Sequence, residues 1–156
     1  LNKKNTVIHE LIQSVINDCS PLAEQKNINI QYNTLANKKL GCSLDYHWCS
    51  RALTNLISNA IGYAKAQVLL NVNIVETQLT INVEDDGKGI DKDKLAIIFT
   101  PFVKLDAERS REQGHFGLGL AICAKVMNWH HGDIIASNSK QLNGACFTLK
   151  FPITQR

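Results

Sequence analysis

The sequence lacks any long apolar run, so it predicts no segment that crosses a bilayer, which takes about 18 consecutive apolar residues. No signal peptide opens it, and no internal repeat, linker or low-complexity stretch divides it. A strong excess of one charge is also missing, because 17 Lys and Arg stand against 14 Asp and Glu. The resulting net charge of +3 is small and scattered, which argues against a nucleic-acid-binding protein.

The sequence contains cysteine, but not in the paired spacings that are typical of metal or redox sites. The 5 cysteines form an odd set without a C-x-x-C spacing, and each stands among apolar residues, where a free thiol packs as a small hydrophobic side chain. This pattern favours a reduced, cytoplasmic protein over a disulfide framework or a zinc site. The sequence begins at Leu1 and not at Met, so we expect it to be part of a longer protein.

The length of 156 residues and the 44% of apolar residues are those of one globular domain. Apolar periodicity predicts helices over 6–24 (ending near Pro21 or shortly after it), over about 46–64 after a capping Asp45, over 91–99, and over 117–131 with Gly132 as its stop. Strands are predicted at about 28–32, 40–44, 68–75, 78–85, 133–137 and 145–151, the third and fourth forming a hairpin. We expect one mixed α/β domain whose mostly antiparallel sheet is covered by helices. Residues 103–116 show neither period, and a loop of that length is usually functional.

Two asparagines stand out on the helix that follows Asp45. Asn55 and Asn59 are four residues apart and therefore share a helix face, which Gly62 and Tyr63 extend. Asparagine is a poor helix former, so an aligned pair in mid-helix needs a reason. One reason is a solvated polar face. The other is a pair of neutral oxygen ligands for a hard cation such as Mg²⁺.

A second candidate lies where a predicted strand meets a glycine-rich turn, in the segment V-E-D-D-G-K-G-I of residues 83–90. Period two places Asp85 on the same side as the apolar residues of its strand, and a buried carboxylate needs hydrogen-bond donors. Asp85 can satisfy the backbone of its own Asp-Gly turn. Alternatively, it can accept a hydrogen bond from the exocyclic amine of a base, which Gly87 and Gly89 would allow to approach closely.

The third candidate is the segment G-H-F-G-L-G-L of residues 114–120, which leads into a helix. Glycines there leave N–H groups free at the positive end of the helix dipole, which suits a phosphate. The segment follows a long loop and contains no Gly-Lys-Ser/Thr, so it is neither a Rossmann fingerprint nor a Walker A loop. The cations of that loop, Lys104, Arg109 and Arg111, are either solvated charges or phosphate clamps.

Together, N-L-I-S-N-A (55–60), D-D-G-K-G-I (85–90), I-F-T-P-F (98–102) and the glycine-rich segment 114–122 resemble the N, G1, F and G2 boxes of bacterial sensor histidine kinases, most of all the RstB type. The resemblance covers essentially the whole chain. It implies an α/β (α+β) two-layer sandwich of the Bergerat type shared with Hsp90, gyrase and MutL. That fold has a mixed, mostly antiparallel sheet of about five strands, about three helices and a long ATP lid, here about 103–116. Residues 1–156 would then be one catalytic domain, without the dimerisation and phosphoacceptor domain.

The resemblance also implies the roles of individual residues. Asp85 would bind the adenine amine, Asn59 would hold Mg²⁺ with help from Asn55, and Asn59 and Lys104 would be catalytic. The full set of nucleotide-binding residues implied in this way is Asn55, Asn59, Tyr63, Asp85, Gly87, Gly89, Ile90, Phe102, Lys104, Arg109, Gly114, Gly117, Leu118, Gly119 and Leu120. The cofactors would be ATP and Mg²⁺.

The chain departs from the family pattern at three positions. Gly62 stands where Lys or Arg usually contacts a phosphate, His115 replaces a common Gly, and Lys104 stands where Arg is frequent. Arginine binds phosphate through two parallel hydrogen bonds, and lysine does not. We therefore expect weaker nucleotide affinity than in a member with the full consensus, but not its loss.

In ATPase relatives a glutamate on the helix of the two asparagines acts as general base, whereas Asn55 and Asn59 are neutral, so we expect slow hydrolysis. The resemblance implies transfer of the γ-phosphoryl group to a histidine on a separate dimerisation domain, and then to an aspartate of a response-regulator receiver domain. No histidine of this chain is expected to be the phosphoacceptor, including His9, although H-E-L at 9–11 resembles the start of that motif.

Two other functions remain open from the sequence. One is an anti-sigma-factor-type serine kinase, and the other is a degenerate module that binds nucleotide or a partner without catalysis. In the histidine-kinase reading we expect the chain to be a monomer on the cytoplasmic side of the bacterial inner membrane, within a membrane-anchored, homodimeric parent. No nucleic-acid partner is expected.

Overall fold

The computed structural model describes residues 1–100 and 119–153. Its main sheet has five strands in the order β2-β4-β5-β7-β6, and β1 and β3 form a separate two-stranded sheet. The strands are β1 Lys4–Val7, β2 Asn29–Thr34, β3 Gly41–Leu44, β4 Gln67–Val75, β5 Gln78–Asp85, β6 Asp133–Asn138 and β7 Ala145–Pro152. The helices are α1 Ile8–Gln25, α2 Tyr46–Tyr63, α3 Lys92–Leu95 and α5 Gly119–Trp129.

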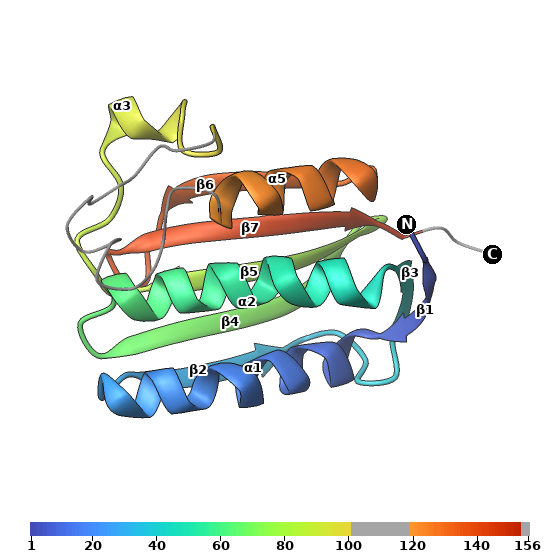
Figure 1. Ribbon diagram of the computed structural model, residues 1–156, viewed down its shortest axis with the longest axis horizontal. Helices are drawn as coiled ribbons and strands as arrows, with labels where there is room; N and C mark the ends of the chain where they lie inside the picture. The colour runs from blue at the N-terminus through green and yellow to red at the C-terminus, as the bar shows by residue number, and fades with distance from the viewer. Residues whose placement is uncertain (101–118, 154–156) are drawn as a thin grey trace.

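The architecture is the two-layer α/β sandwich that the sequence predicts. Figure 1 shows α1, α2 and α5 side by side over one face of the main sheet, with the short α3 set apart from them. β2 pairs with β4 in parallel, and every other neighbouring pair of the main sheet is antiparallel. The predicted hairpin is confirmed, because β4 and β5 are joined by the two residues Glu76 and Thr77. Glu76 takes the left-handed conformation that such a tight turn needs, with φ 58°.

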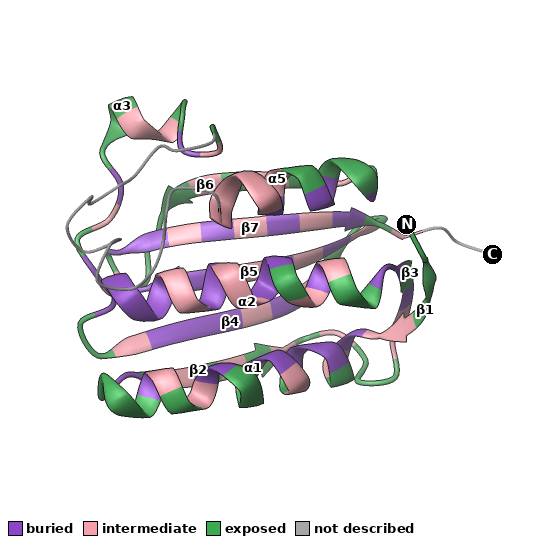
Figure 2. Cartoon of the chain, viewed as in Figure 1, coloured by how far each residue is buried: buried purple, intermediate pink, exposed green. Residues whose placement is uncertain are grey.

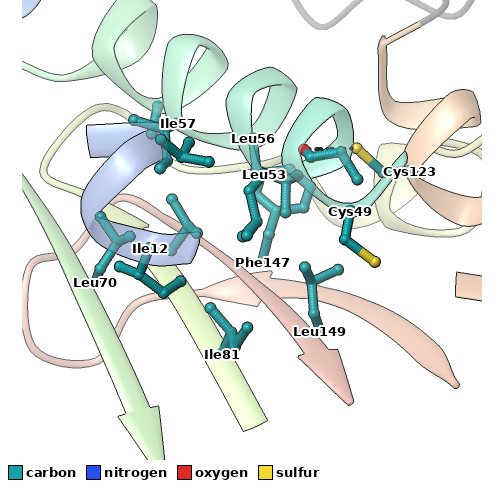
Figure 3. Packing of buried hydrophobic residues seen from close by; sticks show 14 of the residues in the cluster. Ile12, Cys49, Leu53, Leu56, Ile57, Leu70, Ile81, Cys123, Phe147 and Leu149 are labelled. Atoms are coloured by element: carbon teal, nitrogen blue, oxygen red, sulfur yellow. Dashed lines mark hydrogen bonds between the residues drawn. The ribbon is translucent and has the colours of Figure 1, made fainter. Parts of the chain in front are cut away.

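The core lies between the helices and the sheet. The inward face of α2 supplies its largest part, and Figure 3 shows Leu53, Leu56 and Ile57 above Phe147 and Leu149 of β7. Each of these five side chains is at most 1% exposed. Figure 2 shows the matching pattern on the three long helices, which are buried toward the sheet and exposed away from it. This pattern is what an amphipathic helix on a half-buried sheet requires.

Asp45 begins α2 as the sequence predicts. Its Oδ1 accepts a hydrogen bond from the Trp48 N–H at 3.1 Å, and its Oδ2 accepts one from the Asn2 N–H at 2.8 Å. The Asn2 bond is the main reason why the pKa of Asp45 lies below its ordinary value. The first residues of the chain are thereby tied to the start of the central helix.

The first helix begins later than predicted and ends within one residue of the predicted end. Residues 4–7 form strand β1, and the helix ends at Gln25, beyond Pro21. Pro21 lies on the exposed side of α1, where water can bind the carbonyl group that a proline leaves without a partner. Ala23, buried against the core, holds the last turn in place. Asn27, with φ 57°, then ends the helix, and the Ile28 N–H donates back to the Ala23 carbonyl at 2.8 Å.

Two further predictions were wrong in detail. The helix predicted at 91–99 contains only Lys92–Leu95. Gly132 does not end α5 through its conformational freedom, because His131 takes the left-handed conformation with φ 57°. The Gly132 N–H donates to the Met127 carbonyl at 2.9 Å, and a Cβ on Gly132 would lie 2.2 Å from the Lys150 carbonyl oxygen. Glycine is therefore needed at 132 for close packing against β7.

All 5 cysteines are free thiols, four of them buried. Burial raises the pKa of Cys49 and of Cys123 to about 12, so both thiols stay protonated near neutral pH. Within the described part of the chain, no helix has the length and hydropathy that crossing a membrane would require.

Candidate functional site

The candidate site lies at one end of the sandwich, where the last turns of α2 meet the segment that follows β5 and the start of α5. Gly87 packs directly against α2, and a Cβ there would lie 2.2 Å from the carbonyl oxygen of Tyr63. At the other side of α2, the Asn55 side chain donates from Nδ2 to the Gly119 carbonyl at 3.4 Å. These contacts bring together three of the sequence motifs, from residues 55–63, 85–90 and 119–120.

Asn55 and Asn59 are both half-buried on α2. Because Asn55 uses its amide nitrogen toward Gly119, its amide oxygen is the atom that remains as a ligand or acceptor. Among the residues that the structure describes, no three carboxylate, imidazole or thiol groups gather into a metal site. Amide oxygens together with oxygens of a ligand suit a hard cation that keeps part of its water shell.

Asp85 ends β5 and is only 2% exposed. The predicted alternation is confirmed, since Leu79, Ile81 and Val83 are buried on the same side of the strand. Its Oδ1 accepts hydrogen bonds from the Gly87 N–H at 2.8 Å and from the Ala145 N–H at 3.3 Å. The bond to Gly87 is the Asp-Gly turn that the sequence offered as the first alternative. The bond to Ala145 ties the carboxylate to a second strand, which the sequence did not predict.

Asp86, next to it, has a structural role that the sequence analysis missed. Its carboxylate accepts hydrogen bonds from three consecutive backbone N–H groups, those of Lys65 at 2.7 Å, Ala66 at 3.1 Å and Gln67 at 3.3 Å. Burial raises the pKa of Asp86, but these hydrogen bonds outweigh it and hold the pKa below its ordinary value. Asp86 thus fixes the loop between α2 and β4 beside the candidate site.

The turn after Asp86 is shaped by close contacts. Gly89 has φ +81°, a conformation that favours glycine. Ile90 is 5% exposed, and its N–H donates to Oδ1 of Asn138 at 2.7 Å while its carbonyl accepts from Nδ2 of Asn138 at 3.1 Å. At Gly89 the requirement for glycine is thus conformational. At Gly87 the requirement is space beside Tyr63.

Several predicted residues lie outside the described part of the chain. These are Phe102, Lys104, Arg109, Arg111, Gly114, His115, Gly117 and Leu118. Of the glycine-rich segment, Gly119 and the half-buried Leu120 are described, as the first two residues of α5.

The β6–β7 turn also contacts the site, which no sequence motif predicts. A Cβ on Gly144 would lie 2.1 Å from the Asp85 carbonyl oxygen, so this glycine packs against the candidate site. The dipeptide Asn143-Gly144 is a recognisable turn signal. Its closeness to Asp85, almost 60 residues earlier, comes only from the pairing of β5 with β7.

Comparison with known proteins agrees with this geometry. Residues 44–155 match the family described as "Histidine kinase-, DNA gyrase B-, and HSP90-like ATPase". The sensor protein RstB of Escherichia coli (strain K12) is 36% identical over 111 residues, which cover 71% of this chain and 25% of RstB. The chain thus spans only about a quarter of the length of that relative.

Among solved structures, the catalytic domain of histidine kinase ThkA superposes with a TM-score of 0.87 at 25% identity, covering 99% of this chain and 97% of that domain. ThkA in complex with the response regulator protein TrrA superposes with a TM-score of 0.80, also at 25% identity, covering 97% of this chain and 42% of that chain. The fold, the motifs at the site and these similarities agree that the chain belongs to the histidine kinase-, DNA gyrase B- and HSP90-like ATPase family.

Proposed function

We propose that this chain is the catalytic domain of a two-component sensor histidine kinase, which binds Mg·ATP and donates its γ-phosphoryl group to a histidine on a separate domain. The observation that carries the proposal is the carboxylate of Asp85, held at the buried end of β5 beside the C-terminal turns of α2. The family match and the likeness to the ThkA catalytic domain support it.

The base of the nucleotide would lie against the turn 85–90. Asp85 would accept a hydrogen bond from the adenine amine, and Tyr63, 9% exposed at the end of α2, would line the pocket with Ile90. Gly87 and Gly89 keep the backbone of this turn close to its neighbours without a side chain in the way. A charged acceptor binds an N–H donor more strongly than a neutral one does. Asp85 would therefore contribute strongly to recognition of the adenine amine.

The triphosphate would extend from the base toward Asn55, Asn59 and the start of α5. The two amide oxygens would hold Mg²⁺, whose chemistry is to neutralise charge on the phosphates during transfer. The N-terminal end of α5 at Gly119 presents backbone N–H groups and the positive end of the helix dipole. From outside the described residues, Lys104 and Arg109 would supply further positive charge, and Gly114, Gly117 and Leu118 would complete the glycine-rich segment.

The site is suited to transfer and not to hydrolysis. α2 contains no Asp or Glu, so it offers no carboxylate that could take a proton from an attacking water. In the proposed reaction an imidazole nitrogen of the external histidine attacks the γ-phosphorus. A P–N bond forms, the bond between the γ-phosphorus and the bridging oxygen breaks, and ADP leaves with that oxygen.

The partners follow from the same proposal. The histidine would belong to a dimerisation domain of the longer protein, and the phosphoryl group would pass on to a response-regulator aspartate. That ThkA forms a complex with the response regulator protein TrrA supports a partner of this kind. Anchoring of the longer, homodimeric protein in the inner membrane, with this domain on the cytoplasmic side, belongs to the proposal as well.

Steady-state phosphate release tests the proposed mechanism. The purified chain with saturating Mg·ATP should bind the nucleotide yet show no release of phosphate above an enzyme-free control over hours. Mass spectrometry of the incubated chain should find no phosphohistidine. Rapid and sustained phosphate release would contradict the kinase proposal and indicate an ATPase.

A further inference from the structure

The β6–β7 turn, residues 139–144, contacts the candidate site at points that no sequence motif marks. Asn138, the last residue of β6, stands directly opposite Ala145, the first residue of β7. Each of the two residues that flank the turn therefore contacts the segment 85–90. One contact is made by the side chain of Asn138, which binds Ile90, and the other by the Ala145 N–H, which binds Asp85. Figure 1 shows the start of β7 and the segment after β5 at the same end of the sheet.

The contact of Asn138 with Ile90 is a two-point clamp. Oδ1 accepts from the Ile90 N–H at 2.7 Å, and Nδ2 donates to the Ile90 carbonyl at 3.1 Å. Both polar groups of one residue are thus fixed by a single side chain 48 positions away. The preceding Gly89 runs so close that a Cβ there would lie 2.6 Å from Oδ1 of Asn138. Asn138 therefore fixes the backbone positions of Gly89 and Ile90, at the far end of the turn 85–90.

The β6–β7 turn is itself firmly held. The Ser139 hydroxyl donates to Oε1 of Glu84 at 2.8 Å and accepts from the Leu142 N–H at 2.9 Å. The Ser139 N–H and the Gly144 carbonyl close the turn at 2.6 Å. Ser139 is 5% and Glu84 9% exposed, so this anchor is buried. A rigid turn can transmit position to the residues that it contacts, which a mobile one cannot.

We propose that Asn138 is a positioning residue for the base of the nucleotide: it holds Ile90 and Gly89 so that the turn 85–90 keeps the shape in which Asp85 meets the adenine amine. The inference rests on the proposed nucleotide site. Asn138 touches no reacting atom and acts through the backbone of Ile90. Because Asn138 is exposed, its replacement leaves the core intact and changes mainly the turn that it clamps.

The test compares two ligands that differ only in the group that Asp85 would recognise. Calorimetry measures the affinity for Mg·ADP and for the matching purine nucleoside diphosphate without the 6-amino group, in wild type, Asn138→Ala and Asn128→Ala. Asn128 is exposed on α5 and serves as the matched control. Asn138→Ala should weaken ADP about tenfold and the amine-free analogue much less, since about 1.4 kcal/mol corresponds to a factor of ten. Asn128→Ala should change neither affinity.

Each outcome decides the inference. An equal loss for both ligands, or no loss, would overturn it, because a general structural role lowers both affinities alike. Amide hydrogen exchange gives a second measurement, in which the Ile90 amide should exchange faster in Asn138→Ala, while unchanged exchange would overturn the clamp. If wild type binds ADP through Asp85 but Asn138→Ala leaves the ratio of affinities unchanged, the inference fails and the proposed function stands. If wild type binds no nucleotide, the proposed function itself fails.

Discussion

The main-chain N–H of Asp45 donates a hydrogen bond to Nε2 of His130 across 3.0 Å, and this contact joins the start of α2 to the end of α5. Because Nε2 accepts this bond, the other ring nitrogen, Nδ1, donates to the Val126 carbonyl at 2.7 Å. His130 is 4% exposed. Its role is therefore to connect two helices, and it is unavailable as a surface phosphoacceptor.

Replacing His130 by Ala should destabilise the domain by about 2–3 kcal/mol, because the buried Asp45 N–H loses its partner and a cavity remains. Urea unfolding followed by circular dichroism measures the change. His47→Ala is the matched control, since His47 is exposed at the same end of α2, and its effect should stay within about 0.5 kcal/mol. Equal stability of His130→Ala and wild type would refute the proposed role.

Asp86→Asn should cost about 1–3 kcal/mol at pH 7, because the carboxylate accepts three backbone N–H groups. The pKa of Asp86 is lower in the folded than in the unfolded chain, so its contribution is fully present above the unfolded value of about 4. The contribution is lost as the pH falls through the lower, folded value. The gap in unfolding free energy between wild type and Asp86→Asn should therefore shrink below pH 4.

The control for this pH dependence is Asp133→Asn, since Asp133 is an exposed carboxylate on the edge strand β6. The difference in unfolding free energy between Asp133→Asn and wild type should be small at every pH. A gap for Asp86→Asn that stays constant between pH 7 and pH 3 would show that the carboxylate charge contributes nothing to the loop between α2 and β4.

Gly87→Ala should disrupt the site, because the added Cβ would lie 2.2 Å from the Tyr63 carbonyl oxygen and the turn would have to move. We expect a loss of about 1–3 kcal/mol in stability, as for other overpacked positions, together with loss of nucleotide binding. Gly119→Ala is the control for stability, since its Cβ would meet Asn55 only at an ordinary 3.7 Å. Thermal unfolding of both variants separates the two cases, and equal melting temperatures would contradict the prediction.

The cysteines should react slowly in the folded protein. Burial raises the pKa of Cys49 and of Cys123 to about 12, so almost no thiolate is present at pH 8. Cys146 is the most accessible of the five, being only half-buried, and it should be alkylated first. Timed iodoacetamide labelling with mass spectrometry measures the order. Early labelling of Cys123 in native buffer would contradict the packing around α5.

Much of this structure could be predicted from the sequence, because its signals are local. The helix period places Asn55 and Asn59 on one face, and the strand period buries Asp85. Ordinary propensity also predicts the hairpin of β4 and β5. β1 could not be predicted in this way, since four residues paired only with β3 show no period of their own. The predicted helix 6–24 already contains Pro21, and α1 ends only one residue later, at Gln25. The cost of proline in a helix depends on whether its lost hydrogen bond faces water.

The parts of the site that were missed depend on contacts between distant residues. The Asn138 side chain binds Ile90, which the pairing of β6 with β7 and of β7 with β5 brings near. The Asp86 carboxylate binds the backbone of residues 65–67. In the sequence, asparagine and aspartate beside a turn are typical turn residues and do not indicate these contacts. The close packing of Gly87 against the Tyr63 carbonyl was not predicted either, because it depends on how α2 lies against the turn 85–90.

The most direct test of the central claim is calorimetric titration of Mg·ADP into wild type and Asp85→Asn. Asparagine keeps one oxygen for the Gly87 N–H, so the turn is preserved, but it presents an NH₂ donor in place of the second carboxylate oxygen. We expect wild type to bind and Asp85→Asn to bind at least about tenfold more weakly, from the loss of a charged hydrogen bond. Equal affinity of the two proteins, or no binding by wild type, would contradict the assignment of this site to a nucleotide.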